Sequence, residues 1–174
     1  MREALDAARW APSPHNAQPW RFVAVTSTGG KSRLAEAMAE KFRQDLSADG
    51  LSPTDVEVRV ERARRRLLEA PTAVVACLTS EGLQRYPDAR RQEAERTMGL
   101  HSLGAAIQNL LLALHSRGLG ACWMCAPLFC PEAVRAALAL PQHWEPQAMI
   151  TVGEPAENPN PPPRLALEDI VIYR

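Results

Sequence analysis

Ala73-Val74-Val75-Ala76-Cys77-Leu78-Thr79 is an unbroken, mostly apolar run, and it decides how the chain folds. Pro71 precedes the run and Ser80-Glu81-Gly82 follows it, so the run has the length of a strand rather than of a helix. A strand that is apolar at successive positions has both faces buried. The run therefore predicts a strand in the middle of a sheet.

Working outward from this strand, the spacing of apolar residues predicts helices alternating with short strands. The expected helices span residues 2–10, 29–48, 54–69, 88–117 and 131–140, and the expected strands span 20–26, 73–79, 121–125, 148–152 and 169–173. There is no strict strand–helix–strand repetition, which favours an α+β fold over a doubly wound one. One domain over residues 1–174 accounts for the whole pattern.

The predicted helix over 88–117 becomes nearly apolar all round in its second half. A helix of that kind cannot face water on every side, so it belongs in the centre of the domain or against a second subunit. Gly104, Ala105 and Ala106 would let a neighbour approach closely.

Composition removes several classes of function. The chain has 46% hydrophobic and 23% charged residues, with 20 Lys plus Arg against 20 Asp plus Glu. This balance gives no reason to expect nucleic acid or an anionic membrane as a partner, and the arginine run over 62–66 is interpreted as a solvated helix face. No uninterrupted apolar stretch has the length of a membrane span, so a cytoplasmic protein is expected.

Cysteine, tryptophan and histidine are interpreted mainly as structural. Four cysteines in apolar surroundings are expected to be core thiols rather than zinc ligands: Cys77, Cys122, Cys125 and Cys130. The four tryptophans, Trp10, Trp20, Trp123 and Trp144, are expected to anchor the core, although Trp123 is placed to line a site. His101 and His115 are interpreted as helix-face residues, which leaves His15 as the functional candidate.

The C-terminal region contains a proline-rich stretch over residues 155–163. It could be a linker to another domain, but Ile170-Val171-Ile172-Tyr173 follows it and has the character of a strand. We therefore expect an extended arm that crosses the surface, with a partner subunit as one place for it to end.

Three segments carry polar chemistry. The loop over 11–20 presents Ser13, His15, Asn16 and Gln18, which suit the edge of a planar heterocycle, although turn chemistry alone would explain them. In the turn over 117–123, a helix cap accounts for Gly118 and leaves Gly120 to admit a flat ring. On the proline arm, Arg164 suits a phosphate, with a solitary surface arginine as the alternative.

Together these segments resemble the nitroreductase family. The resemblance rests on an Ala-Pro-Ser-x-x-Asn-x-Gln-Pro-Trp loop at 11–20, a Gly-Leu-Gly-x-x-Trp turn at 118–123, and Arg164 before a Leu-Glu-Asp-like segment. It implies a mainly antiparallel sheet flanked by helices, a homodimer, and FMN bound by Ser13, His15, Asn16, Gln18, Gly118, Gly120 and Arg164. FMN would carry the hydride chemistry, so no catalytic acid or base is expected.

A closer likeness is to the flavin domain of the bifunctional enzyme of coenzyme F-420 biosynthesis. The segment over 42–50 resembles that domain, and Asp45 matches a position that contacts its deazaflavin. The arginine-rich segment with which the family usually begins is not found upstream of the Pro-Ser loop. Three alternatives therefore stay open: a deazaflavin reductase, a general NAD(P)H-dependent nitroreductase or quinone reductase, and a flavin-free dimeric binding protein.

Overall fold

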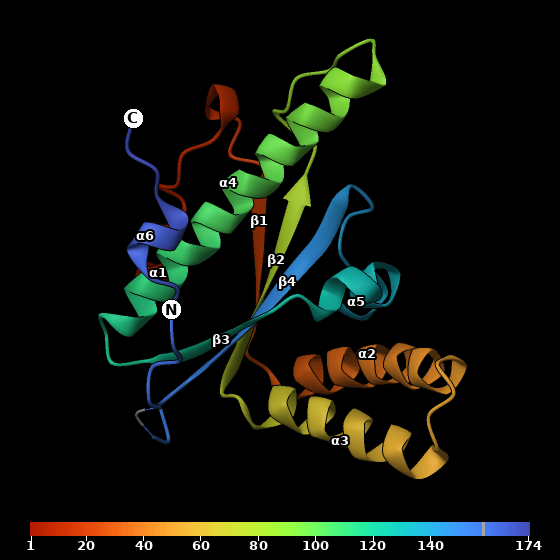
Figure 1. The fold of residues 1–174 in the computed structure, drawn as a ribbon. Coiled ribbons are helices and arrows are strands. Elements are labelled where there is room, and N and C mark those ends of the chain that lie inside the picture. Colours follow the sequence, from red (N-terminus) through yellow and green to blue (C-terminus); the bar gives the residue numbers. More distant parts are fainter. Residues whose placement is uncertain (158) are drawn as a thin grey trace.

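A single antiparallel sheet organises the chain in a computed structural model that describes residues 1–157 and 159–174. The strands lie in the order β1-β2-β4-β3 (Figure 1). Their bounds are β1 Trp20–Val25, β2 Thr72–Thr79, β3 Gly120–Met124 and β4 Trp144–Gly153. Every neighbouring pair is antiparallel, which confirms the α+β prediction and the mainly antiparallel sheet.

The apolar run quoted first is β2, and it lies between β1 and β4 as predicted. Successive side chains of a strand point to opposite faces of its sheet. Accordingly Val74 and Ala76 join one hydrophobic core, whereas Val75 and Cys77 join another on the opposite face. The continuous apolar run thus reflects a strand that serves two cores at once.

Helices cover both faces of the sheet (Figure 1). On one face α1 (Arg2–Ala8) packs against α4 (Ala89–His115). On the other face α2 (Thr28–Ala48) packs against α3 (Pro53–Glu69) and α5 (Pro131–Leu138). The sheet is therefore the middle of three layers, and the two cores lie on either side of it.

The α4 helix is long and apolar enough to cross a membrane, contrary to the sequence expectation that no stretch has this character. In this fold its apolar side lies against the sheet and α1, with Leu103, Ile107, Leu110 and Leu114 buried. It behaves as the core helix of a globular domain.

The α2–α3 hairpin is fixed by local capping. Ser27 and Ser52 each accept a hydrogen bond from a backbone N–H in the first turn of the following helix. At the turn between the helices, Gly50 has φ +81° and the backbone N–H of Leu51 donates to the Leu46 carbonyl. A left-handed residue just after a helix is the conformation that glycine adopts without strain.

Both ends of α4 follow their sequence signals. Asp88 caps the beginning by accepting from the Arg91 backbone N–H, a hydrogen bond that lowers the pKa of the Asp88 carboxyl. After the end of the helix Gly118 has φ +73°, and the Leu119 N–H donates to the Leu114 carbonyl. The cap expected at Gly118 is therefore confirmed.

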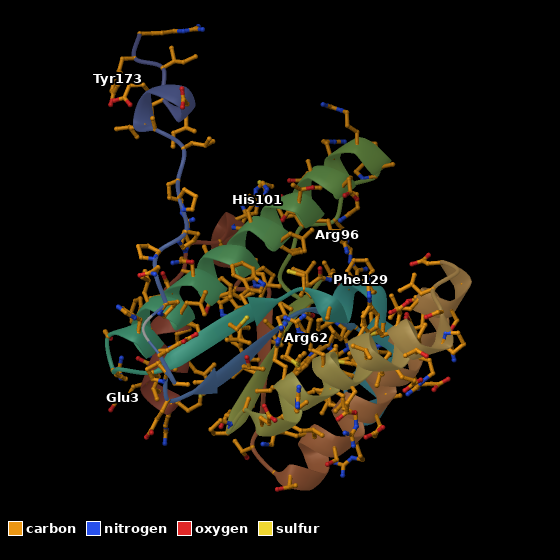
Figure 2. The ribbon with its side chains drawn as sticks, turned by 60° about the horizontal axis from the view of Figure 1, so that its bottom comes forward. Glu3, Arg62, Arg96, His101, Phe129 and Tyr173 are labelled. Carbon is orange, nitrogen blue, oxygen red and sulfur yellow. The ribbon has the colours of Figure 1, made fainter. Side chains whose placement is uncertain are left out.

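The expected last strand over 169–173 is wrong. The structure has a short helix, α6 (Leu167–Ile170), at this place, and Ile172 and Tyr173 beyond it are 79% and 85% exposed. Figure 2 shows the arm and Tyr173 projecting away from the body of the domain. A β-branched segment forms a strand only where a neighbouring strand pairs with it, and within the described residues no strand pairs with 169–173.

Two other expectations need correction. Cys77 and Cys130 are buried as expected, but Cys122 and Cys125 are exposed because they lie on the edge strand β3 and immediately after it. Trp20 is a core residue, whereas Trp10 is 75% exposed and lies outside the hydrophobic cores of the described residues. An apolar neighbourhood in sequence does not reveal which strand lies at the sheet edge.

Candidate functional site

A cavity of about 560 Å³ lies between the α2–α3 hairpin and the segment that follows β3. That segment begins with the short helix η2 (Ala126–Phe129) and leads into α5. Met149 of β4 lies on the sheet side of the cavity, and Phe42 of α2 and Phe129 of η2 also line it. The volume falls within the range of roughly 300–1,000 Å³ typical of small-molecule sites.

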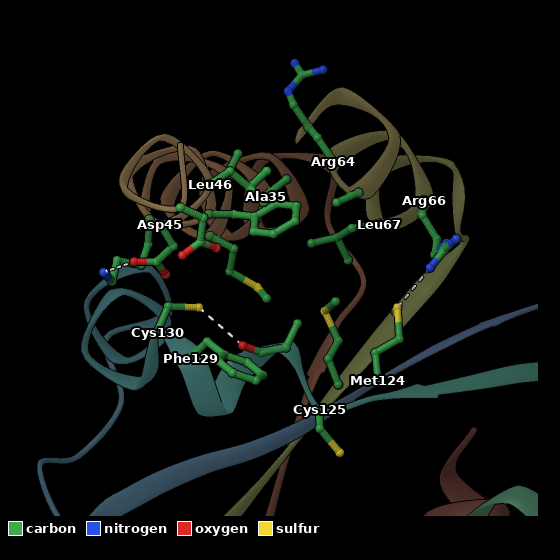
Figure 3. Close-up of a pocket in the computed structure, with 18 residues that line it drawn as sticks. Ala35, Asp45, Leu46, Arg64, Arg66, Leu67, Met124, Cys125, Phe129 and Cys130 are labelled. Carbon is green, nitrogen blue, oxygen red and sulfur yellow. Dashed lines mark hydrogen bonds and ion pairs between the residues drawn. The ribbon is translucent and has the colours of Figure 1, made fainter. Parts of the chain in front are cut away.

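The cavity walls are mostly apolar and rich in sulfur. Figure 3 shows Met124, Cys125 and Cys130 on one side of the cavity and Ala35, Leu46 and Leu67 on the helices opposite. Methionine side chains are polarisable and adapt to the faces of flat rings. Such a lining suits a planar conjugated ligand.

Three cations stand at the cavity, and they differ in their partners. Lys41 pairs with Asp45, and Arg64 pairs with Glu36 and Glu61. Arg66 has no carboxylate partner among the residues that the structure describes; its Nη1 lies 4.0 Å from the Met124 Sδ. Of these three cations, Arg66 is therefore the one left available for a ligand.

The two cysteines at this cavity have different environments. Cys130 is buried, and burial together with the nearby Asp45 carboxylate raises the pKa of its thiol. Cys125 is exposed and leaves β3 with φ −94° and ψ 19°, a sparsely populated backbone region that active-site residues often occupy. The backbone turn at Cys125 is the point where the sheet edge meets the cavity.

Among the residues predicted for the site, Asp45 lines this cavity. The loop residues lie elsewhere, beside α4 and before β1, where η1 (Pro14–Asn16) forms. Part of their chemistry closes the loop on itself: the Ser13 Oγ accepts from the Gln18 backbone N–H, and the Gln18 Nε2 donates to the Asn16 carbonyl.

The glycine turn and Arg164 also lie outside the cavity lining. Gly120 begins β3, whereas the cavity is at the other end of that strand. A Cβ at Gly120 would lie 3.4 Å from the Pro155 Cα, so the chain packs closely there against its own C-terminal region. Arg164 is exposed on the arm and donates to the carbonyls of Pro162 and Pro163.

The loop and the glycine turn are held apart by α4. His15 faces Glu95 near the beginning of this helix, and Gly118 follows its end at His115. With a rise of about 1.5 Å per residue, roughly 30 Å of helix separates the two places. Within one chain the two segments cannot contact the same ring, so a shared site needs two chains.

Sequence reasoning missed Arg66 and Cys125. The arginine run was interpreted as a solvated face, and this holds for Arg62 and Arg65, which are exposed and do not line the cavity. The other two arginines of the run, Arg64 and Arg66, line it. The helical period gives the missing signal, because Arg66 stands three residues after Ala63 and one before Leu67, both at the cavity.

Comparison with known proteins decides the family. The nitroreductase family model matches residues 1–154. The chain belongs to the nitroreductase family. A protein named NADH dehydrogenase from Thermus thermophilus is 33% identical over 100% of this chain and 84% of its own length.

Solved structures agree with this nitroreductase fold. A BluB-like flavoprotein from Clostridium difficile superposes with a TM-score of 0.79 at 22% identity, covering 99% of this chain and 87% of the other. The NADPH:FMN oxidoreductase from Vibrio harveyi, complexed with NAD+, superposes with a TM-score of 0.70 at 20% identity, covering 99% of this chain and 66% of the other. At these identities the two solved structures support the fold, and the family assignment rests on the family model.

Proposed function

We propose that this chain is a reductase that holds FMN in the cavity between the α2–α3 hairpin and the end of β3, and takes electrons from NAD(P)H. The observation that carries the proposal is the pairing of an apolar, sulfur-lined cavity with the available guanidinium of Arg66. The isoalloxazine ring is flat and largely apolar, but its pyrimidine edge is polar and gains negative charge on reduction. The residues present therefore fit the group.

The role proposed for Arg66 is electrostatic. Its guanidinium would lie at the polar edge of the ring, where a fixed positive charge favours the reduced, more negative form. Arg64 and Lys41 are less suited to this role because each is already paired with a carboxylate.

In this proposal the backbone at Cys125 contacts the flavin ring, which is the role that the resemblance implied for Gly118 and Gly120. It borders the cavity, whereas Gly120 lies at the opposite end of β3, roughly 13 Å away at about 3.3 Å per residue. We propose that the Met124–Cys125 turn presents main chain to the ring. FMN when bound supplies the hydride acceptor and donor, and the protein supplies position and charge.

A homodimer is part of the proposal. On α4 an exposed stripe at helical spacing consists of Met98, His101, Gln108 and Leu112, with the half-buried Ala105 between them. Trp123 is 40% exposed, and its ring lies 3.9 Å from where a Cβ on Gly104 would be. A second copy would cover this face, pair with the C-terminal arm, and bring its own Ser13, His15, Asn16, Gln18 and Arg164 to the flavin.

A second candidate function is reduction of a deazaflavin precursor of coenzyme F-420. The position of Asp45 at the cavity favours it, because that residue matches a deazaflavin contact in the resemblance. Hydride donor and acceptor preference separates the candidates. NADH or NADPH oxidation with quinones or nitroaromatics as acceptors supports the general reductase, whereas turnover of a dehydro-deazaflavin alone supports the second.

The test of the shared core of both candidates is FMN binding followed by turnover. The purified protein is titrated with FMN by absorbance, and NAD(P)H oxidation is then measured with and without an acceptor. Saturable binding with acceptor-dependent oxidation supports the proposal; a protein that binds no FMN would contradict it.

A cytoplasmic location also belongs to the proposal, since a reducing compartment keeps the exposed Cys122 and Cys125 as thiols.

A further inference from the structure

Glu95 is a buried carboxylate with one oxygen unused. It lies on α4 with 0% exposure, and its Oε1 accepts a hydrogen bond of 3.0 Å from the Gln84 backbone N–H. Its Oε2 is the one buried side-chain polar atom without a partner among the residues that the structure describes. Such an atom is rare in folded proteins and calls for a physical explanation.

The nearest donor to this oxygen is His15, in the loop before β1. The His15 Nε2 lies 3.9 Å from the Glu95 Oε2, which is beyond hydrogen-bond distance but within reach of a small loop movement. The His15 side chain is about half exposed, so it can move without opening the core.

The loop that carries His15 is strained and braced. Three residues of this loop have positive φ: 53° at His15, 56° at Asn16 and 49° at Gln18. This is the left-handed region, which residues other than glycine rarely adopt. The loop after β2 presses on it: a Cβ at Gly82 would lie 2.8 Å from the Ala17 carbonyl oxygen. Strained conformations of this kind persist where surrounding contacts fix them, and they gather at functional sites.

Several other charged groups near these elements already have partners. Glu81 pairs with Arg21 and with His143. The next residue of α4, Arg96, pairs with Glu145, and Arg9 at the end of α1 pairs with Asp6. Among the described residues, His15 is the one basic side chain with a nitrogen within 4.0 Å of the Glu95 carboxylate.

We propose that Glu95 is a positioning residue: its Oε2 accepts a hydrogen bond from the His15 Nε2–H when the loop over 13–18 engages the flavin. The hydrogen bond between the strained loop and Glu95 then forms only when the flavin is bound. This inference rests on the proposed function, because the loop carries Ser13, Asn16 and Gln18 to the cofactor.

A mutant cycle tests the pairing. Glu95→Gln keeps an oxygen for the Gln84 N–H but presents an amide N–H₂ to His15, and His15→Leu removes the donor. His15→Gln restores an N–H donor of similar reach. Glu93→Gln is the matched control, since Glu93 is exposed on the same turn of α4.

Two readouts are measured on these proteins and on the Glu95→Gln/His15→Leu double variant. One is the FMN dissociation constant. The other is hydrogen exchange, in the presence and absence of FMN, at the Ala17 and Gln18 amides, which donate to the Pro14 carbonyl and the Ser13 Oγ. We expect Glu95→Gln and His15→Leu each to weaken FMN binding by about tenfold and to speed exchange in the bound form, the effect of one hydrogen bond to a charged group.

The inference requires that the double variant be no worse than either single variant, that His15→Gln bind FMN more tightly than His15→Leu, and that Glu93→Gln behave as wild type. Additive losses, or a His15→Gln variant as impaired as His15→Leu, would overturn it. Coupled exchange with an unchanged FMN dissociation constant would overturn the positioning role. A wild-type protein that binds no FMN would overturn the proposed function, whereas tight FMN binding by wild type with unchanged dissociation constants in Glu95→Gln and His15→Leu would overturn this inference alone.

Discussion

The Arg66 Nη1 lies 4.0 Å from the Met124 Sδ, so a guanidinium of α3 meets the last residue of β3 across the cavity. This contact joins two segments that are far apart in the sequence. It also places a positive charge next to the turn at Cys125. Apolar side chains of α2 and η2 line the cavity beside this turn. The proposed flavin site follows from this arrangement, and the predictions below test its parts.

Thiol reactivity should separate the four cysteines. Burial raises the pKa of the Cys77 thiol to about 12 and also raises that of Cys130. Because the thiolate is the reactive form, both should resist iodoacetamide at pH 8 in the folded protein, while the exposed Cys122 and Cys125 react. Mass spectrometry after timed labelling measures this, and rapid labelling of Cys77 in the folded protein would contradict the burial.

Alkaline pH should reduce stability through the same Cys77 thiol. Its pKa is raised in the folded state, so the unfolded chain loses the proton first. The stabilisation is complete below the ordinary thiol pKa of 9.0 and falls as the pH rises toward about 12. Urea unfolding at pH 8 and pH 10 should show a smaller pH-dependent loss in Cys77→Ala than in wild type, and equal losses would contradict the prediction.

FMN should protect Cys125 from labelling. Cys125 lines the cavity, whereas Cys122 lies on the same strand outside the cavity lining and serves as the internal control. We expect saturating FMN to slow modification of Cys125 by about tenfold or more, because a bound ring covers the thiol, and to leave Cys122 unchanged. Equal labelling of Cys125 with and without bound FMN would place the flavin elsewhere.

Gly118 should matter for stability rather than for flavin binding. Its φ of +73° disfavours any residue with a Cβ, and nothing lies within 4 Å of the position where that Cβ would be. Gly118→Ala should therefore cost about 1 kcal/mol in urea unfolding, with Gly118→Asn closer to wild type because asparagine tolerates this region. A large rise in the FMN dissociation constant of Gly118→Ala would contradict this prediction and indicate that Gly118 takes part in flavin binding.

The exposed stripe on α4 should hold two copies together. Leu112 is 57% exposed although it is a leucine on the long central helix. Leu112→Lys should shift the wild-type dimer toward monomer in sedimentation velocity at micromolar concentration, and FMN affinity should fall with it. Val58→Lys, an exposed valine on α3, is the control. A wild-type monomer would rule out the dimer.

The fold could be predicted from sequence where the signal is local. The apolar run of β2 and Gly118 after α4 each predicted their element, because period and cap chemistry depend on neighbours in the chain. The strand expected at 169–173 was wrong because strand formation needs a pairing partner that the chain itself does not offer.

The site was harder to predict, since it depends on which elements meet. Asp45 lines the cavity as expected for a ligand contact, but the role of Arg66 depends on its distance from Met124, a residue 58 positions later in the sequence. Composition predicted a solvated arginine run, yet two of its members, Arg64 and Arg66, line the cavity. Local polar motifs therefore indicated the family better than they located the cavity.

The most direct test of the proposed flavin site is an FMN titration of three proteins: wild type, Arg66→Gln and Arg62→Gln. Both variants remove one positive charge from α3, but Arg66 lines the cavity and Arg62 does not (Figure 2 labels Arg62). We expect Arg66→Gln to raise the FMN dissociation constant by about tenfold or more, the loss of one charge-assisted hydrogen bond, and Arg62→Gln to match wild type. Equal affinities in all three proteins, or no binding in wild type, would contradict the site.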